Sequence, residues 1–113
     1  MATRAPRPQL AGVSPIVAAD QLRQALAQEG IAADVHDGYG LALVSVWVDL
    51  VVWSDGLRFW WRVGWNGEHS RPVYAWHPSA DPTRAGRRVA LRYADLRATH
   101  PLSEAVAGAY PWV

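Results

Sequence analysis

Near the start of the chain, apolar residues recur at the spacing of an α-helix. Ser14 followed by Pro15 supplies an N-cap and a first-turn proline, and Gly30 supplies a stop, which predicts a helix over residues 15–29. One stripe of this helix is apolar and should face a core, whereas its other positions are mostly polar. The apolar positions are Ile16, Ala18, Ala19, Leu22, Ala25 and Leu26.

After residue 30 the apolar residues alternate with polar ones, which is the period of a β-strand. Asp37 to Gly40 and the pair Asp55 and Gly56 have turn chemistry, and Asp49 is the expected turning point within an apolar run too long for one strand. The predicted strands would form an antiparallel meander. They cover residues 31–36, 41–46, 51–54, 57–65 and 72–77.

A second helical pattern begins at Asp81 and Pro82 and continues to about Thr99, before Pro101. Its apolar side consists of Ala85, Val89, Tyr93 and Leu96, and its other side is mostly cationic. The order helix, meander, helix predicts an α+β fold. We expect a two-layer sandwich in which an antiparallel meander of four to five strands is flanked by an N-terminal and a C-terminal helix on one face.

At 113 residues, the chain has the length of one domain. Residues 1–13 are predicted to be a flexible arm, residues 14–100 the single domain, and residues 101–113 an apolar tail that packs on the domain or on a partner. The most apolar stretch, residues 41–53, is shorter than the roughly 20 residues that span a bilayer. No secretory signal is visible, so a soluble cytoplasmic protein without membrane contact is expected.

Composition and charge narrow the range of functions. The net charge is +1 and the pI is about 8.3, so no global field favours a nucleic acid or a membrane as partner. All eleven basic residues are arginine, a skew that GC-rich codons produce, and arginine alone is therefore no sign of function. The absence of cysteine excludes a disulfide framework, a thiolate nucleophile and a zinc site with sulfur ligands.

The main anomaly is the content of seven tryptophans. Within the predicted strand 57–65, alternation places Arg58, Trp60 and Arg62 on one face, where an indole between two guanidinium groups suits stacking and cation–π contact. Trp53, Tyr74 and Trp76 on neighbouring strands are candidates to extend this surface. The opposite face of the strand is expected to be core. It consists of Leu57, Phe59, Trp61, Val63 and Trp65.

Two interpretations of the tryptophans stay open at this point. The rings can fill a small core or a dimer interface, or they can form a platform for a ligand or partner. Our leading hypothesis is a non-enzymatic protein-interaction module that forms a homodimer or binds a protein partner through the aromatic and arginine face of the sheet. A first alternative is a small-molecule site, a pocket lined by Trp53, Trp61 and Trp76.

A second alternative is contact with nucleic acid through the cationic side of the second predicted helix. The nearly neutral net charge and the lack of a nucleic-acid motif disfavour this alternative. The possible anion contacts are Arg84, Arg87, Arg88 and Arg92.

No pattern of catalytic or metal-binding residues stands out. His36, His69 and His77 lack the spacing of zinc ligands, and Ser45 and Ser54 lack the glycines of a nucleophile elbow. We therefore predict no metal site, no cofactor and no catalytic residue.

Three segments carry a family resemblance: residues 38–47 (GYGLALVSVW), 52–56 (VWSDG) and 59–62 (FWWR). The pattern resembles small uncharacterised α+β proteins of actinobacteria over about residues 15–100, with the tryptophan-bearing hairpin as its most distinctive part. The resemblance implies an intracellular α+β domain. It brings no activity, substrate or catalytic residue with it.

Overall fold

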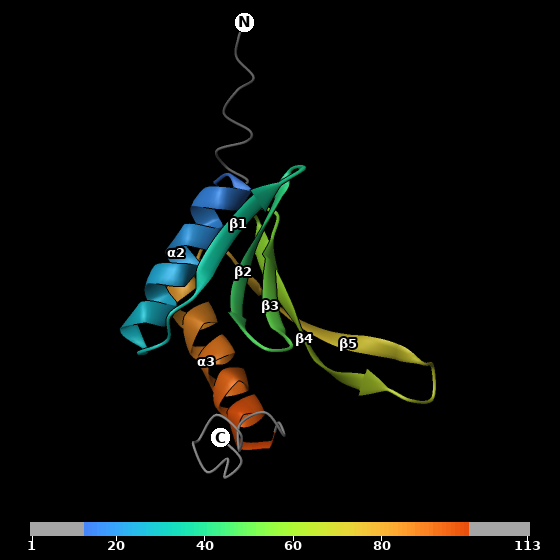
Figure 1. Ribbon diagram of the computed structural model, residues 1–113. Coiled ribbons are helices and arrows are strands. Elements are labelled where there is room, and N and C mark those ends of the chain that lie inside the picture. The colour runs from blue at the N-terminus through green and yellow to red at the C-terminus, as the bar shows by residue number, and fades with distance from the viewer. Residues whose placement is uncertain (1–12, 100–113) are drawn as a thin grey trace, which may run out of the picture.

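The computed structural model describes residues 13–99, so the predicted tail and all but the last residue of the predicted arm lie outside the described residues. Along the chain, one helix precedes and one helix follows a run of five strands (Figure 1). In chain order the elements are α2 (Pro15–Gln28), β1 (Asp34–Gly38), β2 (Leu41–Trp47), β3 (Leu50–Ser54), β4 (Arg58–Asn66), β5 (Arg71–Pro78) and α3 (Pro82–Thr99).

The five strands form a single antiparallel sheet in the order β1-β2-β3-β4-β5. Both helices cover the same face of this sheet, and the β4–β5 hairpin extends beyond them (Figure 1). The predicted two-layer α+β sandwich is therefore confirmed, with five strands. Its consequence for function is that one face of the sheet carries no helix of residues 13–99, and we call it the helix-free face.

The helix caps read from the sequence are present in the structure. The Ser14 hydroxyl accepts a hydrogen bond from the backbone N–H of Val17 at 3.3 Å, and the Asp81 carboxylate accepts one from the N–H of Arg84 at 3.1 Å. Gly30 ends the first helical segment with φ +82°, a conformation that suits glycine.

The core lies between the sheet and the helices. Alternate residues of β2 and β3 point into it, and they meet the apolar stripe of α2 and the first half of α3. Trp61 and Phe59 are the largest side chains buried there, at 2% and 0% exposure. The rest of the core consists of Ala18, Ala19, Leu22, Leu26, Ile31, Ala42, Val44, Val46, Leu50, Val52, Ala85 and Val89.

The first strand begins later than the alternation predicts. Ile31 is buried at 7% exposure, but its backbone N–H bonds to the carbonyl of Leu26 at 2.9 Å, in the cap of α2. Since that donor is used by the helix end, the residue cannot start the ladder, and β1 begins at Asp34.

Two expected core residues of β4 are exposed instead. Leu57 precedes the strand, in the turn, and is 46% exposed. Trp65 is 61% exposed because a bulge between Arg62 and Gly64 adds one residue to β4, after which the faces are exchanged. Placing Trp65 in the core was therefore wrong, and its ring belongs to the face without helices.

A second bulge, in β2, turns a tryptophan toward the helices rather than away from them. The register shifts between Ser45 and Trp47, so that Trp47 lies opposite the buried Leu50 and turns toward the helices. Its ring meets Tyr93 of α3 edge-on, with centroids 6.0 Å apart and an interplanar angle of 76°. The two bulges thus decide that Trp47 faces the helices and that Trp65 is exposed.

Candidate functional site

One line of side chains crosses the whole helix-free face of the sheet. The strand registers place His36 opposite Leu43, Leu43 opposite Trp53, Trp53 opposite Trp60, and Trp60 opposite Trp76. Three indoles therefore occupy neighbouring positions on β3, β4 and β5, where cross-strand partners have Cβ atoms about 5 Å apart. We call Trp53, Trp60 and Trp76 the tryptophan row.

The tryptophan row is open to solvent at its β5 end. Trp76 is 56% exposed and Tyr74, beside it on the same strand face, is 52% exposed, whereas Trp53 and Trp60 are partly buried against their neighbours. Isolated exposed apolar side chains are ordinary, but an aromatic group of this size on one face is typical of an interaction site. The row and Tyr74 are all residues that the sequence singled out.

The two arginines of the predicted Arg–Trp–Arg set flank the row, but they do not sandwich Trp60. The guanidinium of Arg58 lies 5.6 Å from the ring centroid of Trp76, on the next strand, and its Nε is 3.9 Å from Asp55. Arg62 is 3.9 Å from Asp49 instead. The expected stacking thus occurs across strands, between diagonal neighbours: Arg58 lies opposite Pro78, and its long side chain reaches the ring of Trp76 two positions away on β5.

Two open hollows lie on this face, on either side of the Trp53–Trp60 pair. The first has a volume of about 540 Å³. It is lined by Asp55, Arg58, Trp60, Tyr74 and Trp76. The second has a volume of about 330 Å³, and its lining includes His36, Leu41, Leu43 and Trp53. His36 and Leu43 were not predicted to belong to the site, since the register that brings them beside Trp53 was not readable from the sequence.

The free edge of β5 is poorly suited to pairing with another strand. Pro72 and Pro78 lack an N–H donor, and the carbonyl of Trp76 already accepts a hydrogen bond from Arg88 at 2.7 Å. The other edge, β1, has only five residues, with Asp34 and Asp37 among them. The sheet therefore offers its face rather than its edges as an interaction surface.

On the helix side of the sheet, Arg88 joins α3 to β4 and β5. Its guanidinium lies 5.2 Å from the ring centroid of Trp61, and NH1 is 3.2 Å from Nδ1 of His77. Because arginine can only donate, Nδ1 is the acceptor, which is the neutral form of the imidazole. Burial, and then the charge of Arg88, hold the pKa of His77 below its ordinary value.

The pocket expected between Trp53, Trp61 and Trp76 does not exist. Trp61 is 2% exposed on the helix side of the sheet, whereas Trp53 and Trp76 lie on the opposite side. Adjacent residues of a strand point to opposite faces, so no single pocket can contain all three rings.

Most of the possible anion contacts on α3 already have partners within the domain. Arg84 lies 3.8 Å from Asp81, Arg92 lies 3.3 Å from Asp95, and Arg88 is held by β5 as described. Only Arg87 of the four has no ion pair or hydrogen bond with the rest of residues 13–99. The helix therefore presents fewer free cations than its sequence indicates.

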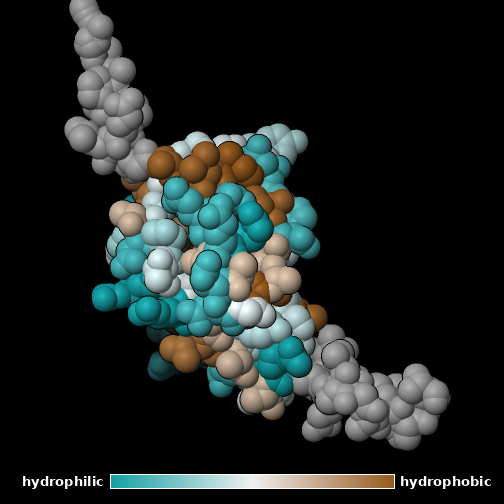
Figure 2. Space-filling view, turned by 90° about the vertical axis from the view of Figure 1, so that its left-hand side faces the viewer, coloured by the Kyte–Doolittle hydropathy of each residue, from teal (hydrophilic) through white to brown (hydrophobic). Residues whose placement is uncertain are grey.

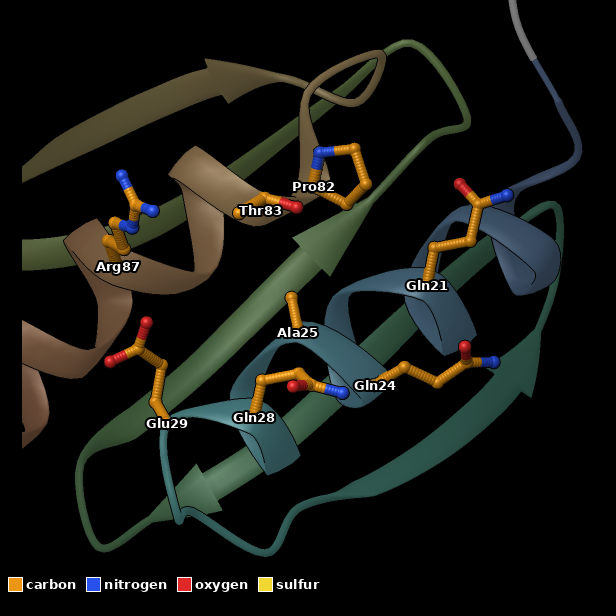
Figure 3. Close-up of a pocket in the computed structure, with 8 residues that line it drawn as sticks. All are labelled: Gln21, Gln24, Ala25, Gln28, Glu29, Pro82, Thr83 and Arg87. Atoms are coloured by element: carbon orange, nitrogen blue, oxygen red, sulfur yellow. The ribbon is translucent and has the colours of Figure 1, made fainter.

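The side of the molecule formed by α2 is mostly hydrophilic, with its most extended apolar area at the upper end (Figure 2). A groove of about 630 Å³ lies between α2 and α3. Ala25 lies in it between the two helices, with Pro82 and Thr83 on the α3 side (Figure 3). Its other lining residues are Gln21, Gln24, Gln28, Glu29 and Arg87, so it has amide and charged groups but no aromatic ring.

Residues 13–99 contain no group of three histidine or carboxylate side chains placed to hold a metal ion. The hydroxyl of Ser54 is fully buried and donates to the carbonyl of Pro15 at 3.0 Å, which gives it a structural role. No helix in this part of the chain combines the length and the apolar character needed to cross a membrane.

No known protein family, curated protein or solved structure matches the chain. The functional argument therefore rests on the geometry of the sheet face.

Proposed function

We propose that the protein is a non-enzymatic interaction module that associates with a second copy of itself through the helix-free face of the sheet. The observation that carries this proposal is the tryptophan row, which places three indoles side by side on a face that no helix covers. Tryptophan, tyrosine and arginine are the residues most enriched at the centres of protein interfaces. If the sheets of two copies packed face to face over these rings, the dimer would have four layers: helices, sheet, sheet and helices.

A second copy is favoured as the partner because the face carries both arginines and carboxylates around the tryptophan row. Arg58 and Asp55 lie at one end of the face, and Arg62 and Asp49 lie at the other. At separations of 3.9 Å on an exposed surface, these pairs contribute little to the stability of the monomer. In a two-fold arrangement each arginine can meet a carboxylate of the partner, so two copies bring no excess of like charge together.

The geometry of the edges supports contact between faces. Extending the sheet through β5 would require main-chain donors that Pro72 and Pro78 lack, and a carbonyl of Trp76 that Arg88 occupies. Face-to-face packing uses side chains only and has no such requirement.

Sedimentation velocity over a series of protein concentrations tests the proposal. We expect the wild-type chain to form dimers, and Trp60→Ala to weaken the dimer by about 30-fold, the loss expected when a central aromatic side chain is removed from an interface. Val17→Ala is the matched control, because Val17 is an exposed apolar residue on the helix side. A wild-type chain that stays monomeric throughout, or a dimer unaffected by Trp60→Ala, would contradict the proposal.

A second candidate function is the binding of a flat aromatic ligand in the hollow beside Trp60. The observation that favours it is the combination of Trp60, Tyr74 and Trp76 with the cation of Arg58 around about 540 Å³. Titration with nucleotides and aromatic metabolites, followed by tryptophan fluorescence, distinguishes the candidates. Quenching that is lost in Trp76→Ala would support the ligand site, and no response to any compound would count against it.

A further inference from the structure

A groove on the helix side of the sheet separates the second half of α3 from the β4–β5 hairpin. The buried residues of α3, Ala85, Gly86 and Val89, all lie in its first half. Beyond them, the helix and the hairpin enclose a hollow of about 430 Å³. We call it the α3–hairpin groove, and its lining includes Trp61, Val63, Ala75, Leu91, Arg92 and Asp95.

The α3–hairpin groove contains apolar surface that the rest of residues 13–99 leaves uncovered. Leu91, which lines the groove, is 72% exposed, and Val63 and Ala75 on the hairpin wall are only partly buried. A two-stranded ribbon without a layer on either face has little stability of its own in water. Covering this surface would stabilise both walls through burial of apolar area.

Arg92, which lines the groove, has an incompletely paired guanidinium. Nε of Arg92 is buried and has no hydrogen-bond partner among the described residues, although NH1 of the same side chain lies 3.3 Å from Asp95. A buried donor without an acceptor costs free energy, so such groups usually have a partner. Because the partly exposed guanidinium of Arg92 lines the groove, an occupant should combine apolar side chains with a group that accepts from this cation.

The chain itself contains a segment with this chemistry. Residues 101–113 (PLSEAVAGAYPWV) are almost entirely apolar, and Glu104 is their one charged residue. They begin two residues after Thr99, the last residue of α3, which forms one wall of the groove. Leu91 is eight residues before Thr99, about 12 Å along the helix, and thirteen residues can extend about 40 Å.

We propose that residues 101–113 bind in the α3–hairpin groove of their own chain. Their apolar side chains cover Leu91 and the hairpin, and the carboxylate of Glu104 pairs with the guanidinium of Arg92. Binding within one chain is favoured because the segment is tethered beside the groove, which gives it a high effective concentration. The proposal concerns the helix side of the sheet and is independent of self-association through the opposite face.

The test uses the full chain labelled with fluorotryptophan, with ¹⁹F NMR as the readout. The resonance of Trp112 is assigned by its loss in Trp112→Phe. We expect its shift between H₂O and D₂O, which reports solvent contact, to be well below that of free fluorotryptophan, and to be the same at low and high protein concentration. In Leu91→Arg, a substitution at an exposed position, the shift of Trp112 should rise toward the value of free fluorotryptophan.

Ala94→Arg is the matched control, because it adds the same charge at an exposed position of α3 that does not line the groove. The resonance of the buried Trp61 reports whether each variant is folded. Glu104→Gln should raise the solvent shift of Trp112 in part. A fully exposed Trp112 in the wild-type chain, burial that depends on protein concentration, or burial that persists in Leu91→Arg would overturn the proposal.

Discussion

Gly86 of α3 lies against Ala25 of α2 at the closest approach of the two helices. A Cβ added to Gly86 would lie 2.9 Å from the Cβ of Ala25 and 3.4 Å from its carbonyl carbon. Because neither atom belongs to a flexible side chain, the contact holds the backbones of the helices at a fixed separation. The contact lies in the first half of α3, whereas the second half lines the α3–hairpin groove.

This contact predicts the effect of Gly86→Ala. In an isolated helix the change would be stabilising by up to about 1 kcal/mol, but here it forces the helices apart, and overpacking typically costs about 1–3 kcal/mol. We expect a net loss of about 1 kcal/mol in the free energy of unfolding, measured by urea denaturation. In Ala25→Gly with Gly86→Ala, the loss should be smaller than the sum of the single losses. If the losses in free energy of unfolding were additive, the Cβ of residue 86 and the side chain of residue 25 would not be in steric contact.

Trp60 and Trp61 provide a test of which face each residue occupies. Trp61 is 2% exposed and stacks with Arg88, so Trp61→Ala should lower the free energy of unfolding by about 3–5 kcal/mol. Trp60→Ala should cost clearly less in the monomer, because its ring is only partly buried. Denaturation at a concentration below that of self-association measures both. Equal losses of free energy in the two variants would mean that Trp60 is as deeply buried as Trp61.

The hydroxyl of Ser54 anchors the start of α2 to the turn between β3 and β4. It donates to the carbonyl of Pro15 at 3.0 Å and accepts from the N–H of Gly56 at 3.3 Å, in a fully buried site. Ser54→Ala should therefore cost about 1–3 kcal/mol, since two buried polar groups lose their partner. Ser45→Ala on the opposite face, without a side-chain hydrogen bond in the described chain, should change the stability by no more than about 0.5 kcal/mol.

His77 should make the stability depend on pH. Burial, and then the charge of Arg88, lower the pKa of His77 in the folded protein below its ordinary value of 6.5. The unfolded state therefore binds more protons than the folded state between the two pKa values, and the free energy of unfolding decreases as the pH falls through 6.5. This decrease should be smaller in His77→Gln, measured by denaturation across that pH range. An unchanged pH dependence in the variant would assign the effect to other groups.

Local patterns were sufficient to predict most of the fold. The caps at Ser14 and Asp81, the turn at Asp49 and the apolar stripes of both helices follow from interactions within a few residues of the chain, which are readable from one sequence. The antiparallel order then follows from short connections. The start of β1 was misplaced because the backbone N–H of Ile31 is used by the end of α2.

Which residues belong to the candidate site could be predicted only where side chains alternate between the two faces of a strand without a bulge. Arg58, Trp60 and Arg62 share a face as predicted, whereas Trp65 was misplaced by the bulge before it. Gly64 was the one available signal, since a glycine inside a strand often marks a bulge.

The sequence by itself determined that this chain has two amphipathic helices, an antiparallel meander and seven tryptophans. Only the tertiary structure decided that Trp53, Trp60 and Trp76 form one row and that Trp61 lies beneath the helices. The physical reason is that helix periodicity and caps depend on neighbours along the chain, whereas strand register and bulges depend on partners far away in it, and each one-residue shift exchanges the two faces of a strand.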